Sequence, residues 1–471
     1  MENKTTLEYI VSLAKRRGFI YPGSEIYGGL SGFYDYGPLG VALKRNIIDA
    51  WLKFFVDGWD DMYQVDSAIL MSRKVWEASG HASGFNDPLV ECSNCHSRLR
   101  DEHIQGNKCP VCGQSGTLGE PKQFNMMLKT FLGPTSTGEE TSNLITDVDK
   151  KLGPDSDGLV AKNRFEYQAE DLTYLRPETA QGMFVNYKNV LDCFYPDLPF
   201  GMAQIGKAFR NEISPRDFLF RLREMEQMEV EYFVAPEQWE EKFEHWRKDM
   251  LEYFKYIVLP GGMIHQLEMP ENERAHYSAK TIDFEFDYPF GRKELAGLAY
   301  RTDYDLKKHQ EASGKSMEYK PKGGGQGFIP HVIEPSIGIE RTVLALLSAA
   351  YTEDEVNGEK RTYLKLLSNI APVKVAVSPL LQNKAELVEK ATEVYDMLKK
   401  EIKDVMWDDN GNIGKRYRRQ DEIGTPYFVT IDFQTIDDNT ITIRNRDTTE
   451  QERVKTPDLL IKLQDREYLT S

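Results

Sequence analysis

Four arginines lie within residues 202–233, between two runs of apolar residues. The runs, Met202 to Phe209 and Val230 to Val234, are separated by a turn-rich segment that contains Pro215, and together they predict a long hairpin. A planar guanidinium group can donate two parallel hydrogen bonds to a phosphate, so this group of arginines favours a triphosphate ligand. A solvated hairpin with alternating charges is the alternative that this segment leaves open. The four residues are Arg210, Arg216, Arg221 and Arg223.

Four of the five cysteines form two CxxC pairs. In a chain without a secretion signal, this spacing is typical of a zinc ribbon, in which four thiolates close a tetrahedral shell. A closed shell has no open position for catalysis, so the metal would order a polar segment that has few apolar residues. A pair of disulfides or free thiols is the alternative. The predicted ligands are Cys92, Cys95, Cys109 and Cys112.

A second arginine-bearing element is predicted in residues 331–351. The pattern indicates a strand that ends at Ile333, a turn from Ser336 to Gly338, and a helix that begins at Ile339. Arg341 would then lie in the first helical turn, where free amide hydrogens and the helix dipole attract an anion. The segment therefore suits a terminal phosphate.

An acidic residue is predicted at another helix start. Pro177 suits a first helical turn, and Glu178 would follow it among the exposed amides. Its carboxylate could accept hydrogen bonds from a substrate ammonium, or could only cap its own helix. Around these elements, a helix over 237–258 and a half-buried strand over 282–287 are predicted as scaffold.

The helix predicted after Pro38 has more apolar residues than one buried stripe requires, up to its stop at Gly58. A subunit interface would explain the excess, and an internal core helix explains it nearly as well. After residue 370, alternating strands and helices predict a small α/β domain with a mixed sheet. A basic cluster at 415–419 fits either a phosphate backbone or a solvated turn.

The order of the motifs resembles the class II aminoacyl-tRNA synthetases. FRNE at 209–212 followed by FRLRE at 220–224 is similar to their second signature, and the segment that carries Arg341 is similar to their third. DYGPLG at 35–40, with the helix after it, resembles their first signature. EQME at 226–229 narrows the resemblance to the glycyl-tRNA synthetases.

RPETAQG at 176–182 and VWEASGH at 75–81 are also similar to glycyl-tRNA synthetases, and the resemblance covers nearly the whole chain. It implies an α/β (α+β) fold with an antiparallel-sheet catalytic domain and a C-terminal α/β anticodon-binding domain. The expected divisions are a catalytic domain at 1–369, a zinc-ribbon-like insertion at 92–112, a mobile loop at 133–157, and an anticodon-binding domain at 370–471.

The resemblance also implies the reaction, in which ATP activates glycine as an adenylate and tRNA(Gly) accepts it. Arg210 would stabilise the α-phosphate, Arg221 and Arg341 would hold the other phosphates, and Glu294 would place Mg²⁺. Met225 stands where the family usually has an aromatic residue against adenine, and a thioether can also lie against a purine. The ATP site implied is Arg210, Asn211, Glu212, Phe220, Arg221, Leu222, Arg223, Glu224, Met225, Glu294, Leu295, Gly338, Ile339, Glu340 and Arg341.

A pocket crowded around the α-carbon would exclude alanine by overlap, so a proofreading site is not needed. Acids would bind the ammonium, and Arg100 or Arg301 would bind the carboxylate. The glycine site implied is Arg100, Glu178, Met225, Glu226, Gln227, Met228, Glu229, Arg301, Glu334, Pro335, Ser336, Ile337 and Gly338.

The expected partners are tRNA(Gly), glycine, ATP and a second copy in a homodimer, with no membrane. A net charge of −16 means that tRNA must be met by local basic patches. The composition and the absence of long apolar runs predict a cytoplasmic protein. Two alternatives remain: a relative that forms an adenylate without charging tRNA or with another amino acid, and an RNA-binding protein built on a retired synthetase fold.

Overall fold

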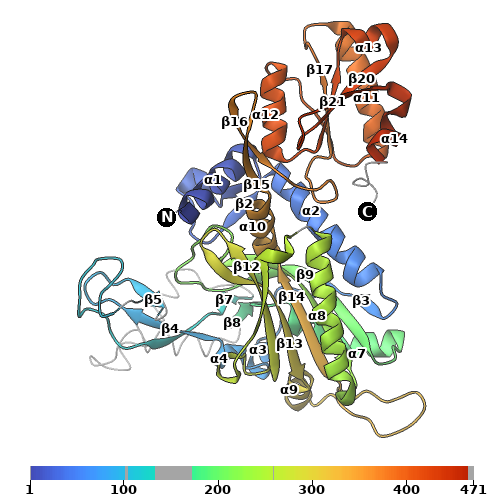
Figure 1. The fold of residues 1–471 in the computed structure, drawn as a ribbon. Helices are drawn as coiled ribbons and strands as arrows, with labels where there is room; N and C mark the ends of the chain where they lie inside the picture. Colours follow the sequence, from blue (N-terminus) through green and yellow to red (C-terminus); the bar gives the residue numbers. More distant parts are fainter. Residues whose placement is uncertain (1, 101–103, 105, 133–171, 258, 465–471) are drawn as a thin grey trace.

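The computed structural model describes residues 2–100, 104, 106–132, 172–257 and 259–464, and its centre is a seven-stranded sheet (Figure 1). The strands pair in the order β11-β12-β13-β14-β10-β9-β3. All neighbours are antiparallel except β3 and β9. The strands are β3 (Met62–Gln64), β9 (Phe200–Phe209), β10 (Glu224–Val234), β11 (Ile264–Glu268), β12 (Lys280–Tyr288), β13 (Gly291–Thr302) and β14 (His331–Gly338).

The long hairpin predicted around the arginines is confirmed as β9 and β10. Glu224 pairs with Phe209 at the mouth, and the ladder continues to Phe233 opposite Phe200. The predicted half-buried strand is β12, in which Ile282, Phe284 and Phe286 are buried and alternate with less buried acids.

One face of the sheet is covered by helices α2 (Pro38–Leu52), α8 (Trp239–Tyr256) and α10 (Ile339–Ala350), which share the main hydrophobic core with it. Part of the other face packs against α7 (Ala180–Phe194). Because successive side chains of a strand point to opposite faces, each central strand contributes alternate residues to the helix-covered core and to the opposite face. That opposite face carries the site.

Helix α2 continues as a π-helical turn, Lys53–Asp57, and ends at Gly58 as predicted. Several of its extra apolar side chains pack against α8 of the same chain. Phe55 stacks on Trp246, and Phe54 contacts Tyr253. Gly40 allows a close approach, because a Cβ there would lie 1.9 Å from the carbonyl oxygen of Phe19. Core packing thus explains these aromatics, and the dimer stays a prediction.

Two local predictions are wrong. The turn predicted at Ser336 to Gly338 is strand, because β14 continues to Gly338 between two pairing neighbours and α10 begins at the next residue. The helix predicted to start at Pro177 is α7, which begins at Ala180 with Thr179 at its N-cap. Glu178 therefore precedes the helix, and its carboxylate is not in the first turn.

The C-terminal part forms a five-stranded mixed sheet in the order β18-β17-β19-β20-β21, as the alternating pattern predicted. Its strands are β17 (Val375–Pro379), β18 (Val405–Trp407), β19 (Tyr427–Ile431), β20 (Thr440–Asn445) and β21 (Gln451–Lys455). Its helices are α11 (Ala385–Glu401), α12 (Ile413–Ile423), α13 (Phe433–Asp438) and α14 (Leu459–Gln464).

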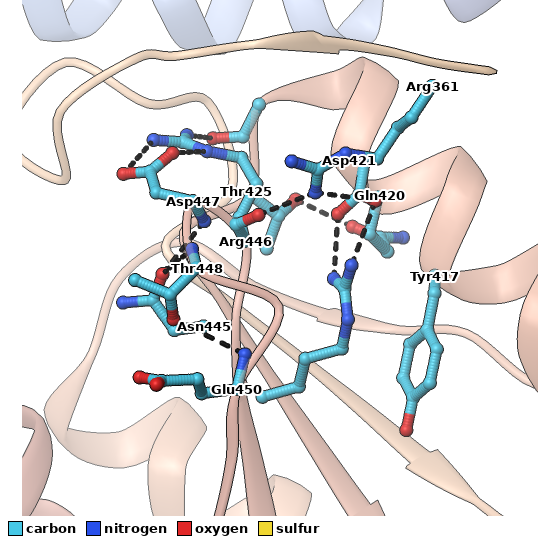
Figure 2. A network of polar contacts seen from close by, with 12 residues as sticks. Arg361, Tyr417, Gln420, Asp421, Thr425, Asn445, Arg446, Asp447, Thr448 and Glu450 are labelled. Atoms are coloured by element: carbon cyan, nitrogen blue, oxygen red, sulfur yellow. Dashed lines mark hydrogen bonds and ion pairs between the residues drawn. The ribbon is translucent and has the colours of Figure 1, made fainter. Parts of the chain in front are cut away.

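A hairpin made of β15 (Tyr351–Val356) and β16 (Glu359–Leu364) joins the two parts beside α12 (Figure 1). Arg361 of β16 is fully buried, and its Nη1 donates to the carbonyl oxygen of Arg446 at 2.6 Å and lies 3.4 Å from Oδ2 of Asp421 on α12 (Figure 2). Arg446 in turn donates to the carbonyls of Leu366 and Gly424. We call this group the arginine lock.

The insertion between α4 (His81–Gly84) and β7 (Leu128–Phe131) is a small sheet of β4 (Asn86–Glu91), β5 (Arg98–Arg100) and β6 (Lys122–Asn125). Strand β7 pairs with β8 (Leu172–Leu175). The loop predicted at 133–157 lies outside the described residues. Among the described helices, none has the length and apolar character needed to cross a bilayer.

Candidate active site

A cavity of about 300 Å³ opens on the face of the sheet opposite α8 and α10. It brings together residues from both predicted sites, although they come from four separate segments of the sequence. Those that line it are Glu178, Arg210, Phe220, Leu222, Met225, Gln227, Glu229, Glu294, Leu295, Glu334, Ser336, Gly338, Glu340 and Arg341.

Because successive side chains of a strand point to opposite faces, the residues predicted at 225–229 divide into two sets. Met225, Gln227 and Glu229 line the cavity, whereas Met228 lies in the helix-covered core. Glu226 also points away, and its Oε1 lies 2.8 Å from Nζ of Lys44 on α2. The same alternation holds on β14.

On β14, Glu334, Ser336 and Gly338 line the cavity, and Ile337 is buried in the core behind it. Pro335 lies between two cavity residues and pairs with Leu298 of β13. Ile339 begins α10 and is also in the core. Pro335, Ile337 and Ile339 therefore support the site from behind.

Some hairpin-loop residues predicted at the nucleotide are bound elsewhere. The guanidinium of Arg223 donates to the carbonyl oxygens of Glu212 at 2.8 Å and Ser31 at 3.2 Å. Glu224 pairs with Lys207. The main-chain amide of Asn211 donates to Met126 at 2.8 Å. These residues fix the loop to its surroundings.

One end of the cavity, where the sequence predicted the nucleotide, carries a cation beside an acid. Nη1 of Arg341 lies 2.8 Å from Oε2 of Glu294, and its guanidinium lies 4.6 Å from the centre of the Phe220 ring. The charge of Arg341, with smaller effects from Arg210 and Arg221, lowers the pKa of Glu294. Arg210 and Arg341 therefore line the same cavity as this acid. Arg221 lines a neighbouring hollow formed with residues 28–34.

Glu178 lies at the other end of the cavity in a network of buried polar groups. Its Oε2 is 3.3 Å from Nε2 of His81, and its Oε1 accepts a hydrogen bond from Gln181 at 3.0 Å. Burial opposes ionisation, but His81 and Arg301 hold the pKa of Glu178 well below its usual value. Glu178 is thus an ionised acid.

Arg301 does not line the cavity, and its side chain is fully buried. It donates a fork of hydrogen bonds to Asp305, at 2.8 and 3.0 Å, and its Nη1 lies 3.0 Å from Oε2 of Glu334. Its guanidinium also lies 3.7 Å from the centre of the Tyr277 ring. Arg301 therefore lies outside the cavity lining, where it contacts Asp305 and Glu334 and can hold these acids in position.

Two further acids complete this end. Glu229 accepts a hydrogen bond from the Thr179 hydroxyl, and Gln227 lies 3.4 Å from the hydroxyl of Ser336. Burial, opposed by Arg301, raises the pKa of Glu334 well above its usual value. The site thus has a cationic end and an acidic end within one cavity.

Comparison with known proteins agrees with this geometry. The family described as tRNA synthetase class II core domain (G, H, P, S and T) matches residues 164–350, and the anticodon binding domain family matches residues 374–466. A glycine–tRNA ligase of Thermobifida fusca is 44% identical over 472 residues, which cover 95% of each chain. A second, of Treponema denticola, is 42% identical over 98% of this chain and 97% of its own.

This chain belongs to the glycine–tRNA ligase family. The family resemblance and the class II fold expected from the sequence are therefore confirmed. A third ligase, of Caldanaerobacter subterraneus subsp. tengcongensis, is 44% identical over 96% of this chain.

Sequence reasoning about this ligase-family chain missed Asp283. It lies on β12 and lines the cavity near Glu294, and burial and the charge of Glu294 raise its pKa to about 7. The alternating pattern of β12 predicted that Asp283 faces away from the core. What it could not reveal was that this face of β12 lies beside Glu294 of β13.

Arg100, predicted near the amino acid, ends strand β5, but its side chain lies outside the described residues. The four cysteines of the same insertion converge. Their sulfur atoms lie within 4.8 Å of one another, and two of the separations are 3.7 Å, from Cys92 to Cys112, and 3.8 Å, from Cys95 to Cys109. A tetrahedron with zinc–sulfur bonds of about 2.3 Å has edges of roughly 3.8 Å, so the donor set fits zinc. These cysteines form no disulfide.

Proposed function

We propose that this protein activates glycine with ATP as glycyl-adenylate and transfers the glycyl group to tRNA(Gly). The observation that carries the proposal is the single cavity in which a cationic end, with Arg210 and Arg341, meets an acidic end, with Glu178 and Glu229. Membership of the glycine–tRNA ligase family supports the same reaction.

In the first step, a carboxylate oxygen of glycine attacks the α-phosphorus of ATP, and the bond to the bridging oxygen breaks to release pyrophosphate. Such chemistry depends on positioning and on charge stabilisation. We assign the α-phosphate to Arg210 and the β- and γ-phosphates to Arg221 and Arg341. Because Arg341 is paired with Glu294, nucleotide phosphates would compete with that carboxylate for the guanidinium.

Asp283 and Glu294 are the proposed ligands of Mg²⁺. Both are acids of the cavity, and burial, with repulsion from Glu294, raises the pKa of Asp283. Carboxylate oxygens are the ligands that this ion prefers, and the bound ion would neutralise phosphate charge. The acid pair is thus suited to a cation that approaches with ATP.

At the acidic end, Glu178, Glu229 and Glu334, with the hydroxyl of Ser336, would bind the ammonium of glycine. They come from two neighbouring strands and from the segment before α7, and we expect a methyl group on the α-carbon to overlap them. Arg301 is occupied by Asp305 and Glu334, so we assign it to positioning these acids. Arg100 then remains the proposed partner of the glycine carboxylate.

In the second step, a terminal hydroxyl of tRNA attacks the adenylate carbonyl, and AMP leaves. The basic cluster at 415–419 lies on α12, where Arg416 is buried and Arg419 pairs with Asp408. Lys415 is exposed and Arg418 is half-buried, and both line a hollow of about 770 Å³ with Tyr417. We propose that this hollow contacts the tRNA backbone.

The zinc would order the insertion. The sequence leads us to expect a reducing cytoplasm as its location, and we propose that the active protein is a homodimer. Zinc would close a shell of four thiolates and supply no catalytic position.

Glycine-dependent exchange of pyrophosphate into ATP, measured with each amino acid in turn, tests the proposed function. We expect exchange with glycine alone, and we expect Glu178→Gln and Ser336→Ala to lose it. Intact exchange in both variants would show that the pocket assignment is wrong. Binding of tRNA without exchange in the wild type would instead support a retired synthetase.

A further inference from the structure

Glu231 is a buried acid that the proposed mechanism does not use. It lies on β10, on the same face as Gln227 and Glu229, but one step deeper, and it does not line the cavity. Its exposed fraction is 0%, and neither of its carboxylate oxygens has a hydrogen-bond partner among the residues that the structure describes.

The nearest groups are themselves acids. One carboxylate oxygen each from Glu229, Glu231 and Glu334 lies within 4.8 Å of the others. The charged groups that act on Glu231 are Glu334 of β14, Arg301 of β13, Glu229 of β10 and Asp305 of α9 (Tyr304–Ser313). Three of these four repel an ionised carboxylate.

Arg301, the one cation of this set, is already paired with two other acids. Arg301 donates to Asp305 through Nε and Nη2, and its Nη1 lies 3.0 Å from Glu334. Glu229 has the hydroxyl of Thr179 as a donor. Glu231 has no comparable donor within the described part of the chain, so it is the acid of the three for which ionisation is least favourable.

A dehydrated carboxylate without a donor is strongly unfavourable, and acids that share a site avoid this by retaining a proton. Burial and the charge of Glu334 accordingly raise the pKa of Glu231 well above its usual value. A protonated carboxyl group is also a hydrogen-bond donor, and the nearest carboxylates, Glu229 and Glu334, are acceptors.

We propose that Glu231 keeps a proton in the working enzyme and can donate one hydrogen bond within this cluster of acids, so that it positions Glu229 and Glu334 around the glycine ammonium. The role rests on the proposed glycine pocket. Glu231 is a positioning residue, because it acts through the two acids and does not reach the cavity itself.

Two substitutions at this position separate a neutral donor from a counter-charge. Glu231→Gln keeps the shape and a donor without charge, so the KM for glycine in pyrophosphate exchange should rise less than about threefold. Glu231→Leu removes the donor at similar volume, and the KM for glycine should rise about tenfold or more while the KM for ATP changes less than about threefold. Glu229→Gln serves as the matched control and should be severely impaired.

The outcomes are distinct. A Glu231→Gln variant as impaired as Glu229→Gln would show that Glu231 is a charged ligand of the ammonium. An unimpaired Glu231→Leu variant would show that the side chain only fills space. Either result overturns the proposal. If Glu229→Gln is itself unimpaired, the pocket assignment fails, which is a separate result.

Infrared spectroscopy gives a direct measurement that does not depend on activity. A protonated carboxyl group has a carbonyl stretch that an ionised carboxylate lacks. The spectrum of the wild type minus that of Glu231→Gln, recorded at neutral pH on folded protein, should contain this band. A difference spectrum that shows only ionised carboxylate bands would overturn the proposal.

Discussion

Nζ of Lys44 lies 2.8 Å from Oε1 of Glu226, on the face of β10 opposite to Glu229. Two acids of the same EQME motif, three residues apart, are thus assigned to different tasks by the alternation of a strand. Glu226 joins β10 to α2, and its main-chain amide donates to Oε2 of Glu340 at 2.8 Å. Glu229 instead lines the cavity.

Glu226→Gln and Glu229→Gln are therefore expected to differ. Loss of the charged acceptor in Glu229→Gln should raise the KM for glycine by about 10- to 100-fold, the equivalent of 1.5–3 kcal/mol for a hydrogen bond to a charged group. Glu226→Gln should change that KM less than about threefold. Pyrophosphate exchange with varied glycine measures both, and equal losses would contradict the assignment by strand face.

Arg301 should matter for folding as well as for glycine. Replacement by Met leaves Asp305 and Glu334 buried without their cation, so the free energy of unfolding should fall by about 3–5 kcal/mol. The control is Arg292→Ala, since its pair with Asp287 is exposed and should contribute less than about 1 kcal/mol. Urea unfolding followed by circular dichroism measures both variants, and similar losses would contradict this prediction.

Glu340 predicts a pH dependence of stability. Burial, with repulsion from Glu226, raises the pKa of Glu340 from 4.5 to about 7. The native state therefore retains a proton that the unfolded chain releases in this interval. The free energy of unfolding should fall as the pH rises from 4.5 to about 7. The decrease is up to about 3 kcal/mol, at about 1.4 kcal/mol for each pKa unit.

Glu340→Gln should make this part of the pH profile less steep, because glutamine does not titrate, while Asp283, Glu231 and Glu334 keep their raised pKa values. Glu355→Gln, at an exposed position of β15, should leave the slope as it is in the wild type. Chemical unfolding at several pH values measures the slope. A slope as steep in Glu340→Gln as in the wild type would show that Glu340 does not contribute to it.

Lys415 and Arg418 should affect the second step alone. Alanine at either position should raise the KM for tRNA, reduce the slope of log KM against log salt by about 1, and leave pyrophosphate exchange intact. Lys400→Ala, an exposed change at the end of α11, is the control and should alter neither step. Aminoacylation assays over a range of salt concentrations measure this.

The four cysteines predict about one zinc per chain. Cys95→Ser should remove it, because three thiolates do not close the shell, whereas Cys193→Ser should retain it, since Cys193 lies on α7 outside the cluster. Metal analysis of the purified variants measures the content. Equal zinc in both variants would place the ion elsewhere.

The motifs and the alternation of residues along the strands predicted many of the residues that line the cavity. Arg210, Glu294 and Arg341 were predicted as one cluster and lie around one cavity. The error at β14 arose because Ser336 and Gly338 have the local preferences of a turn, whereas pairing with both β10 and β13 holds them extended.

Tertiary contacts account for what the sequence could not show. The position of Asp283 beside Glu294 depends on the register of β12 against β13, which includes a bulge. Glu231 belongs to the same acidic stretch as Glu229, and only the fold shows that it lies beneath the cavity. Sequence spacing alone carries neither fact, because both depend on which strands become neighbours.

The arginine lock has a thermal consequence. A chain cut at residue 370 would separate Arg361 from Asp421 and would uncover Arg446, whose partner Leu366 lies on the other side of the cut. Each fragment would then lack the contacts that join the two parts in the intact chain. Calorimetry should accordingly show one endotherm for the intact protein, with both parts melting together.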